Sequence, residues 1–468
     1  MTARCAAAGN EEMRARDLFL GMWIPDLFME RVRDGGVWSL MNPADCAGLS
    51  EVWGYQFRTL YESYEHEGRF VYQLPARTLF NKILESQLET GQPYILYKDT
   101  CNAKSNQKNL GTIKGSNLCA EVVEYVSSDE VAVCNLASVG LPSFVRDGDG
   151  DDAVFDYAHM HAVVKIMTRN LNKIIDKNFY PIAEARRSNL RNRPIGIGIQ
   201  GLADALVLLG IPFDSADAVE FSANVAECMY HAAVEASVEL AERDGPYESF
   251  AGSPASYGQL QFDLWDVRPR MYGDWAQLKA RVKRGGMRNS LLIALMPTAS
   301  TSQILGFNEA MEPFTSLIYK RKTLAGEFIV INRHLVRALE RLGIWSEAMR
   351  EKIVVAGGSV ADIPEIPVDV RALFKICWEI KQRHVMDMAV ARGAYTCQSQ
   401  SMNLFMQDAD FTKLTSAHFY SWAKGLKTGV YYLRTRQKAG AQKFTVEPKG
   451  VAAAAVVCTN EVCTMCSS

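Results

Sequence analysis

Hydrophobic residues recur along two long stretches of this chain at the spacing of a helix. In residues 159–176 the apolar positions follow the helical period, and Pro181 lies just beyond them. Residues 214–246 predict a longer helix, capped by Asp214 or Ser215 and ended by a Gly-Pro pair. We therefore expect two substantial helices here.

Shorter apolar runs lie between the helical stretches. Residues 290–296, SLLIALM, and residues 428–433, TGVYYL, predict buried strands. From about residue 437 the chain becomes basic and then rich in small residues, which predicts a flexible tail. The pattern as a whole indicates an α/β fold.

Composition narrows the class of protein. The 468 residues carry a net charge of −2, so no overall field favours nucleic acid or an anionic membrane. No apolar run reaches the roughly 18 residues of a spanning helix. The first residues lack the apolar core of a secretory signal, and Glu11 and Glu12 oppose a transit peptide. Eleven scattered cysteines favour a reducing compartment, so we expect a cytoplasmic protein.

Two short motifs resemble ligand-binding loops in their letters alone. Gly196, Gly198 and Gly201 match the dinucleotide fingerprint, but the residues before them cannot form its strand, which favours close backbone packing instead. Residues 147–152 place carboxylates at calcium-loop positions, but the loop lacks the required Gly and has Ala158 in place of the final Glu. We interpret that segment as a solvated acidic loop.

The most informative motif is Asn117, Cys119 and Glu121, at alternate positions, with Cys134 fifteen residues after Cys119. In an extended segment these three side chains would project to one side, and the two intervening residues to the other. An amide, a thiol and a carboxylate would then converge on one small volume. A half-buried strand with an incidental polar face remains the alternative.

The last eleven residues contain Cys458, Cys463 and Cys466. A close thiol pair at a chain end suits thiol–disulfide exchange. A zinc site is the alternative, but it needs a fourth ligand, and no histidine lies nearby in sequence. No other metal site is expected in the chain.

Several blocks, in the same order, resemble the large catalytic subunit of class I ribonucleotide reductase, and the spacing of Cys119 and Cys134 resembles the eukaryotic type. The resemblance runs from about residue 12 to the C-terminus. It rests on these segments: ARDLFLGMWIPDLFMERV, ETGQPYILYKDTCNAKSNQKNLGTIK, SNLCAEVVEYVSSDEVAVCNLAS, RPIGIGIQGLADA, RNSLLIALMPTASTSQILGFNEAMEPF and LKTGVYYLRTR.

The resemblance implies a role for each residue of the thiol motif. Cys119 would become a thiyl radical that removes the 3′ hydrogen of a ribose in a ribonucleoside diphosphate. Glu121 would accept the 3′-hydroxyl proton as the 2′-hydroxyl leaves as water. Asn117 would hold the sugar hydroxyls. Cys134 would be one of two thiols that reduce the 2′ carbon and end as a disulfide.

Hydroxyl groups precede an apolar helical run at residues 296–303. Ser300 and Gln303 fit a capping box, which would suffice to explain the pattern. A capped helix N-terminus also binds phosphate, and the resemblance implies that the substrate diphosphate docks there. The residues implied are Thr298, Ala299, Ser300, Thr301 and Ser302.

Tyr431 and Tyr432 are adjacent aromatic residues within a predicted strand and could simply be core. The resemblance implies that they relay a radical from a metal-containing small subunit to Cys119. No cofactor would then bind this chain directly.

The resemblance also implies a use for the terminal thiols. Cys463 and Cys466 would reduce the active-site disulfide and be re-reduced by thioredoxin or glutaredoxin. Cys458 has no assigned role. The remaining cysteines are expected to be ordinary free thiols: Cys5, Cys46, Cys101, Cys228, Cys377 and Cys397.

The implied fold is part of a ten-stranded α/β barrel with a catalytic finger loop, followed by a C-terminal α/β region. Residues 1–11 are unassigned, 12–436 form this catalytic portion, and 437–468 form the shuttle tail. The family carries several hundred preceding residues, including most ATP and dNTP effector sites and the first redox cysteine, and is homodimeric when intact. We therefore expect a split or truncated subunit that needs a separate N-terminal half, or an incomplete gene product. It should be inactive alone.

A second hypothesis is a catalytically incompetent homologue that binds the small subunit or thioredoxin. The thiol motif and both tyrosines are intact, which favours the catalytic hypothesis.

Overall fold

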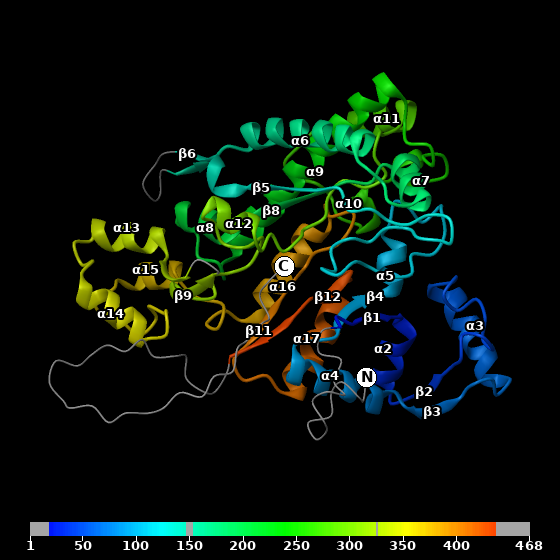
Figure 1. The fold of residues 1–468 in the computed structure, drawn as a ribbon, viewed down its shortest axis with the longest axis horizontal. Helices are drawn as coiled ribbons and strands as arrows, with labels where there is room; N and C mark the ends of the chain where they lie inside the picture. The colour runs from blue at the N-terminus through cyan, green and yellow to red at the C-terminus, as the bar shows by residue number, and fades with distance from the viewer. Residues whose placement is uncertain (1–17, 147–152, 324–325, 437–468) are drawn as a thin grey trace.

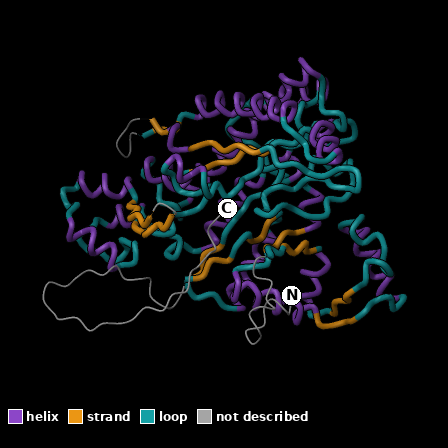
Figure 2. Tube along the Cα trace, in the orientation of Figure 1, coloured by secondary structure: helices purple, strands orange, loops and turns teal. Residues whose placement is uncertain are grey.

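A computed structural model describes residues 18–146, 153–323 and 326–436. Helices and long connecting loops dominate these ranges, and the strands are short (Figure 2). The α/β fold class predicted from the sequence is therefore confirmed. Residues 437–468, with the three terminal cysteines, lie outside the described residues, as do Cys5 and the acidic segment 147–152.

The strands of the described ranges form one three-stranded sheet and five two-stranded pairs, and no closed barrel is present among them. The sheet has the order β1-β4-β12; β4 pairs parallel with β1 and antiparallel with β12. The strands, grouped by sheet, are β1 (Gly21–Ile24), β4 (Tyr94–Tyr97) and β12 (Thr428–Val430); β2 (Val37–Leu40) and β3 (Tyr72–Pro75); β5 (Leu136–Gly140) and β8 (Gly196–Gln200); β6 (Val145–Arg146) and β7 (Val154–Phe155); β9 (Ile318–Thr323) and β10 (Gly326–Ile331); β11 (Leu404–Met406) and β13 (Leu433–Thr435).

Helices surround these strands on several sides. The α-helices are α2 (Asp26–Asp34), α3 (Gly54–His66), α4 (Ala76–Thr90), α5 (Lys98–Ala103), α6 (Tyr157–Lys177), α7 (Ala183–Asn192), α8 (Leu202–Leu208), α9 (Ala216–Asp244), α10 (Gln261–Leu264), α11 (Trp275–Gly285), α12 (Thr301–Leu305), α13 (Arg333–Arg341), α14 (Glu347–Val355), α15 (Val368–Leu373), α16 (Gln382–Gly393) and α17 (Phe411–Ala423). Two 3₁₀ helices are η2 (Leu141–Phe144) and η4 (Pro254–Tyr257).

The elements gather into layers around a central region (Figure 1). Helices α6 and α9 pack on each other, and α6 also contacts β5 and β8. On the other side, α5 contacts β1 and β4, and α17 contacts β12. Helix α16 packs on α9, α17 and β11, and so it links the two layers.

The two long helices predicted from the sequence are confirmed. Helix α6 begins after Asp156, whose side chain accepts a hydrogen bond from the His159 backbone at 3.0 Å. Helix α9 is capped by Ser215, whose hydroxyl accepts from the Ala218 backbone at 3.1 Å, and Gly245 ends it. The Asp214 carboxylate instead pairs with Lys375.

Both predicted strands differ from expectation. Residues 290–296 are buried but form no continuous strand. Ile293 forms an isolated β-bridge with Ile197 and Leu295 forms one with Gln400, because the segment runs between two different neighbouring segments instead of pairing along one of them. The 428–433 segment contains all of β12 and the first residue of β13, with the tyrosine pair between the two strands. The chain leaves one sheet and joins another at that point.

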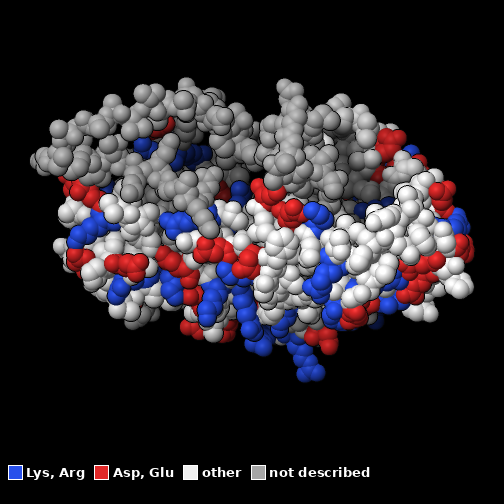
Figure 3. Space-filling view, turned by 90° about the horizontal axis from the view of Figure 1, so that it is seen from below, with Lys and Arg blue, Asp and Glu red and all other residues white. Residues whose placement is uncertain are grey.

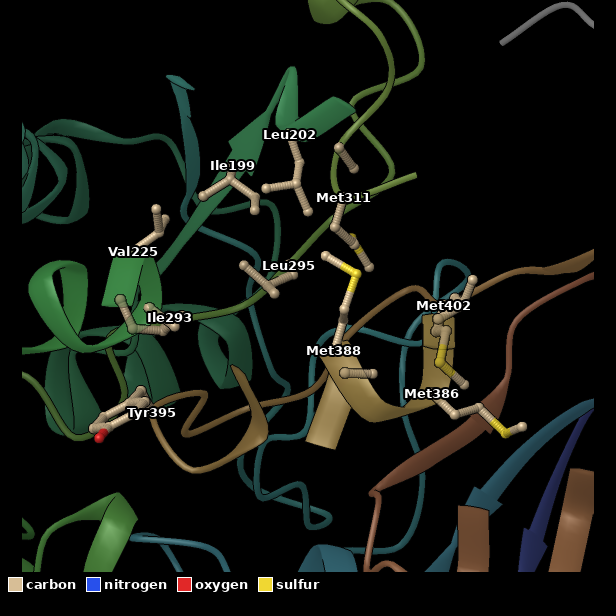
Figure 4. Packing of buried hydrophobic residues seen from close by; sticks show 14 of the residues in the cluster. Ile199, Leu202, Val225, Ile293, Leu295, Met311, Met386, Met388, Tyr395 and Met402 are labelled. Carbon is tan, nitrogen blue, oxygen red and sulfur yellow. The ribbon is translucent and has the colours of Figure 1, made fainter. Parts of the chain in front are cut away.

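The core is one large apolar cluster that reaches across the layers. Figure 4 shows side chains from β8, α9, the 293–295 segment and α16 pointing toward one another. The glycines of β8 permit this approach: a Cβ at Gly196 would lie 2.5 Å from a Leu136 methyl, and one at Gly198 would lie 2.5 Å from the Met296 sulfur. The glycine motif thus forms a strand that needs close packing, as the sequence favoured.

The surface carries charges of both signs. In Figure 3 acidic and basic side chains interleave over the face shown. In the described part of the chain, no helix combines the length and the apolar character needed to cross a membrane.

Candidate active site

Asn117, Cys119 and Glu121 lie on a tight turn, not on an extended segment. The Ala120 backbone has φ 62° and its N–H donates to the Asn117 carbonyl at 3.2 Å. Leu118 is 58% exposed, whereas Ala120 is fully buried, so the two intervening residues do not share a face. The alternating geometry predicted from the sequence is therefore wrong.

The turn still gathers the three polar groups. The Asn117 side-chain oxygen accepts from the Val122 N–H at 3.1 Å, which folds the amide back toward the residues after Glu121. A hydrogen bond from Asn117 and one from Ser401 favour the charged form of the Glu121 carboxyl, but burial outweighs them and raises its pKa.

Three donors from the C-terminal part of the chain hold three consecutive carbonyls of this turn. Ser401 Oγ donates to the Cys119 carbonyl at 2.6 Å, and Thr428 Oγ1 donates to that of Ala120 at 2.9 Å. The Ser399 N–H donates to the Glu121 carbonyl at 2.8 Å. These bonds satisfy the buried backbone and help Ala120 keep its left-handed conformation.

The Cys119 thiol is half-buried and lies between a carboxylate and a phenol. Burial and the negative charge of Glu121 raise its pKa, and a hydrogen bond with Tyr431 opposes that rise. The sulfur is therefore held as a neutral thiol at neutral pH. A neutral S–H beside a phenol suits hydrogen-atom transfer better than nucleophilic attack.

Tyr431 and Tyr432 form a three-ring cluster with Tyr94 of β4. Ring centroids lie 4.5 Å apart for Tyr431 and Tyr432, and 4.7 and 5.0 Å from Tyr94 to each of them. The adjacent pair meets at 62°, so the phenols pack edge to face and are not stacked in parallel; this geometry suits the ring quadrupoles. Tyr94 was not singled out from the sequence.

A cavity of about 270 Å³ opens beside the turn. Trp23 and Tyr94 line it together with residues 114–118, so Asn117 and Leu118 form part of its wall. The turn is thus accessible to a ligand from this side.

Cys134 lies two residues before β5 and is exposed. The next residue, Asn135, fixes its position by donating to the Pro194 carbonyl at 2.9 Å and to the Asn189 side chain at 2.6 Å. Desolvation by the surrounding protein, followed by the negative charges of Glu124 and Glu121, raises the pKa of the Cys134 thiol to about 12. Both motif cysteines therefore share one electrostatic environment.

Glu124 is a residue of this site that sequence reasoning missed. Its side chain is 4% exposed, one carboxyl oxygen has no hydrogen-bond partner among the described residues, and burial raises its pKa to about 8. The available signal was a second acidic residue three positions after Glu121. Glu124 contributes most to the charge that acts on Cys134.

This arrangement predicts an unusual pH dependence for Cys134. Its alkylation rate should rise about tenfold per pH unit to about pH 10, without the plateau of an unperturbed thiol near about 8.5. In Glu124→Gln the rate should be several-fold higher above about pH 8, because the wild-type Glu124 carboxyl ionises there and disfavours the thiolate. Iodoacetamide labelling with peptide mass spectrometry measures this rate.

Asp129→Asn is the matched control, since it removes an exposed carboxylate from the same segment. It should leave the Cys134 profile unchanged. A rate difference between Glu124→Gln and wild type that persists at pH 6, where Glu124 is protonated, would contradict the charge-based explanation.

The hydroxyl-rich segment 298–302 forms a second tight turn. Thr298 is buried with φ 55°, and its Oγ1 accepts from the Ala310 N–H at 2.8 Å. Ser302 Oγ donates to the Thr298 carbonyl at 2.7 Å. Ala299, Ser300 and Thr301 are exposed at the start of α12. The Ser302 N–H already donates to the Thr298 carbonyl at 3.0 Å, and the other N–H groups in the first turn of α12 lack intrahelical partners, so they can face an anion.

The predicted capping box is wrong. Ser300 stands at the N-cap position, but its side chain makes no capping bond. Its backbone is helical, with φ −99° and ψ −43°, instead of the extended conformation that aims a cap hydroxyl at the helix.

Backbone pairing places the two turns near each other. Leu295 N–H donates to the Ser399 carbonyl at 3.0 Å, and the Ser401 N–H donates to the Leu295 carbonyl at 2.9 Å. Ser401 in turn holds Cys119. Thr298 follows Leu295 by three residues, a reach of at most about 10 Å.

Lys427 holds residues 396–398, which directly precede the two serines, Ser399 and Ser401, that hydrogen-bond to the Cys119 turn. Its side-chain nitrogen is buried, which lowers its pKa to about 7, and it donates to the carbonyls of Thr396, Cys397 and Gln398 at 3.2, 2.6 and 2.8 Å. Lys427→Met should therefore lower the free energy of unfolding by about 3 kcal/mol, because three buried carbonyls lose their partner. Urea denaturation measures the change.

Lys424→Met serves as the control, because Lys424 is exposed on the same connection. It should shift stability by less than about 0.5 kcal/mol. Equal stability of Lys427→Met and wild type would show that the carbonyls find other donors.

The structure does not bring all the predicted residues together. Cys463 and Cys466 lie outside the described residues, so their predicted role stays a prediction. The five described cysteines that the sequence assigned no role are free, as expected, and the structure shows that they are buried: Cys46, Cys101, Cys228, Cys377 and Cys397.

Comparisons with known proteins agree with one another. The chain is 58% identical over 456 residues to a ribonucleoside-diphosphate reductase large subunit of Trypanosoma brucei brucei, covering 95% of this chain and 54% of that protein. It is 54% identical to a large chain of Schizosaccharomyces pombe, covering 94% and 54%. The chain thus spans about half the length of the curated relatives it matches.

A solved structure is also similar. The class Id ribonucleotide reductase alpha subunit of Actinobacillus ureae superposes with a TM-score of 0.61 at 27% identity, covering 77% of this chain and 61% of that one. A family model described as the ribonucleotide reductase barrel domain matches residues 1–432. With that match over most of its length, the chain belongs to the ribonucleotide reductase barrel-domain family.

Proposed function

We propose that this chain carries the thiyl-radical chemistry that reduces ribonucleoside diphosphates to deoxyribonucleoside diphosphates. One observation supports the proposal above the others: the half-buried Cys119 thiol lies between the Glu121 carboxyl and the Tyr431 phenol. In this proposal the turn is the family's finger loop, and the surrounding strands are part of its barrel.

In the proposed reaction the Cys119 thiyl radical takes the 3′ hydrogen from the ribose. Glu121 accepts the 3′-hydroxyl proton, and its raised pKa makes it a stronger base than an ordinary carboxylate. Asn117, on the cavity wall, orients the sugar hydroxyls. The 2′-hydroxyl takes up a thiol proton and leaves as water, and Cys134 with a second thiol supplies the two electrons and the hydrogen that the 2′ carbon gains, which leaves the two sulfurs as a disulfide. Cys119 then returns its hydrogen atom to the 3′ carbon and becomes a thiyl radical again.

The outer parts of the substrate and the radical have their own proposed contacts. The diphosphate docks at residues 298–302, which offer exposed hydroxyls and N–H groups at the start of α12. This segment follows Leu295, whose backbone pairs with Ser401, the residue that holds the Cys119 carbonyl. Tyr431 and Tyr432 relay the radical from a metal-containing small subunit, and their edge-to-face contact supports this. Cys463 and Cys466 then reduce the active-site disulfide by thiol–disulfide exchange and become a disulfide themselves, which thioredoxin or glutaredoxin reduces.

Further proposals concern the setting of the protein. Residues 12–436 act as the catalytic portion and 437–468 as a redox tail, within a homodimeric assembly. The described cysteines are all free, which supports a reducing, cytoplasmic location.

A chimera tests the activity directly. The part of the Trypanosoma brucei relative that precedes its match would be fused to this chain and assayed with that organism's small subunit, CDP and dithiothreitol. Formation of dCDP within about tenfold of the parent rate is expected. A folded chimera that binds the small subunit without forming dCDP would overturn the proposal and favour a non-catalytic binding role.

A further inference from the structure

A cluster of nitrogen and oxygen ligands joins helices α6 and α9, away from the Cys119 turn. His161 lies on α6, and His231 and Glu235 lie four residues apart on one face of α9. One ligand atom from each residue lies within 4.8 Å of the other two. His161 Nε2 is 2.9 Å from His231 Nδ1 and 3.8 Å from a Glu235 oxygen.

We propose that His161, His231 and Glu235 form a binding site for a divalent cation of the zinc class, which joins α6 to α9. Two imidazoles and one carboxylate are a ligand set that zinc accepts, with water completing a tetrahedron. Ligand atoms that share a zinc ion at about 2.1 Å lie about 3 to 3.5 Å apart. The separations of 2.9 and 3.8 Å lie within a few tenths of an ångström of this range, and the separation between His231 and Glu235, at most 4.8 Å, shortens when both bind one ion.

The protonation pattern leaves a place for a cation. Asp274 accepts a hydrogen bond from His231 Nε2 at 3.0 Å, so the Nδ1 atom of His231 carries a lone pair toward His161. A Glu235 oxygen also faces His161 Nε2. A proton on His161 Nε2 can be donated to only one of these two acceptors, His231 Nδ1 or the Glu235 oxygen. A cation would instead bind both acceptors and, with His161 deprotonated at Nε2, that nitrogen as well.

The surroundings orient the site in advance. A carboxylate on the outer nitrogen of a ligating histidine is a common supporting contact in metal sites. The His231 ring stacks on Tyr272, with centroids 4.1 Å apart and planes at 13°, and meets Trp275 edge-on at 4.7 Å. Glu227 fixes Tyr272 by accepting from its backbone N–H at 3.2 Å. His231 therefore has little freedom to turn away.

Local charge also favours a cation. Four carboxylates, those of Glu235, Glu239, Glu242 and Asp274, lie near three basic groups, Lys165, Arg169 and Arg281. Lys165 donates to Glu235 at 2.8 Å and to Glu239 at 2.6 Å, so it can remain with Glu239 when Glu235 binds a metal. The His161 and Glu235 side chains are 18% and 26% exposed, which leaves a route for the ion.

Cobalt substitution tests the proposal on the full chain. Because the terminal thiols can also bind metal, the background carries Cys458→Ser, Cys463→Ser and Cys466→Ser. Adding one equivalent of Co²⁺ should produce visible d–d bands of a four-coordinate nitrogen and oxygen site, without a thiolate charge-transfer band. Zn²⁺ should displace the cobalt, and it should raise the melting temperature of this protein.

Variants locate the site. His161→Ala and Glu235→Gln should weaken Zn²⁺ binding at least about tenfold, and Asp274→Asn should weaken it by about 10- to 100-fold through the outer contact. His159→Ala is the matched control, since His159 lies exposed on the same helix; binding should be unchanged. The proposal fails if no nitrogen and oxygen spectrum appears, if sulfur bands dominate, or if His161→Ala binds zinc as wild type does.

Discussion

Cys119→Ser is expected to lower dCDP formation by the chimeric enzyme by about 10⁴-fold or more, in line with losses seen when an essential catalytic side chain is removed. Serine nearly matches cysteine in size, so the turn held by Ser401 and Thr428 should persist. The O–H bond of serine is much stronger than a thiol S–H bond, so a serine cannot supply the radical. Radioactive CDP turnover measures the loss, with small-subunit binding measured in parallel.

Cys101→Ser is the control for this prediction. Cys101 is a fully buried free thiol that lies upstream of the turn and outside it. Its substitution tests the general cost of losing a sulfur atom, and turnover should fall less than about threefold. If Cys119→Ser kept more than a few per cent of activity, the radical role of this cysteine would be wrong.

The sequence could predict those elements whose signals are local. Helix α9 has a capping serine and a terminal glycine at its two ends, and both act as their positions indicate. The glycines of β8 could be separated from a nucleotide loop, because a fingerprint without its preceding strand has no phosphate-binding geometry. These features depend on residues close together in the chain.

The local shape of the thiol turn could not be predicted in the same way. Alternation of Asn117, Cys119 and Glu121 is informative only in an extended backbone, and Ala120 adopts a positive φ instead. That conformation is held by Ser401 and Thr428, which lie about 280 and 310 residues further along the chain. No pattern near the motif indicates such partners.

Glu124 and Tyr94 show the same limit for the candidate site. Each lies in a segment whose residues are mostly apolar or aromatic, so each is most simply read as core. Only tertiary structure places Glu124 in the electrostatic environment of Cys134, and Tyr94 against both residues of the tyrosine pair. The tyrosine pair itself was recognised through the family resemblance, since a strand signal cannot distinguish a relay from packing.

Tyr431→Phe is expected to lower turnover of the chimera at least about 10³-fold, which corresponds to about 4 kcal/mol in activation free energy. The phenylalanine ring can keep the edge packing against Tyr94 and Tyr432, with centroids 4.7 and 4.5 Å away in the wild type. It has no phenolic O–H, so hydrogen-atom transfer to Cys119 loses its donor and acceptor partner. Substrate affinity and the reactivity of Cys134 toward iodoacetamide should remain unchanged.

Tyr97→Phe separates this chemical effect from a loss of stability. Tyr97 lies on β4, three residues after Tyr94, and its hydroxyl donates to the His418 carbonyl and contacts Ser421 Oγ, both at 2.8 Å. Removing that hydroxyl should cost about 1 to 2 kcal/mol of stability while turnover stays within about threefold of wild type. A large loss of turnover in Tyr97→Phe, matched by a small one in Tyr431→Phe, would mean that the cluster acts by packing and that the radical reaches Cys119 by another route.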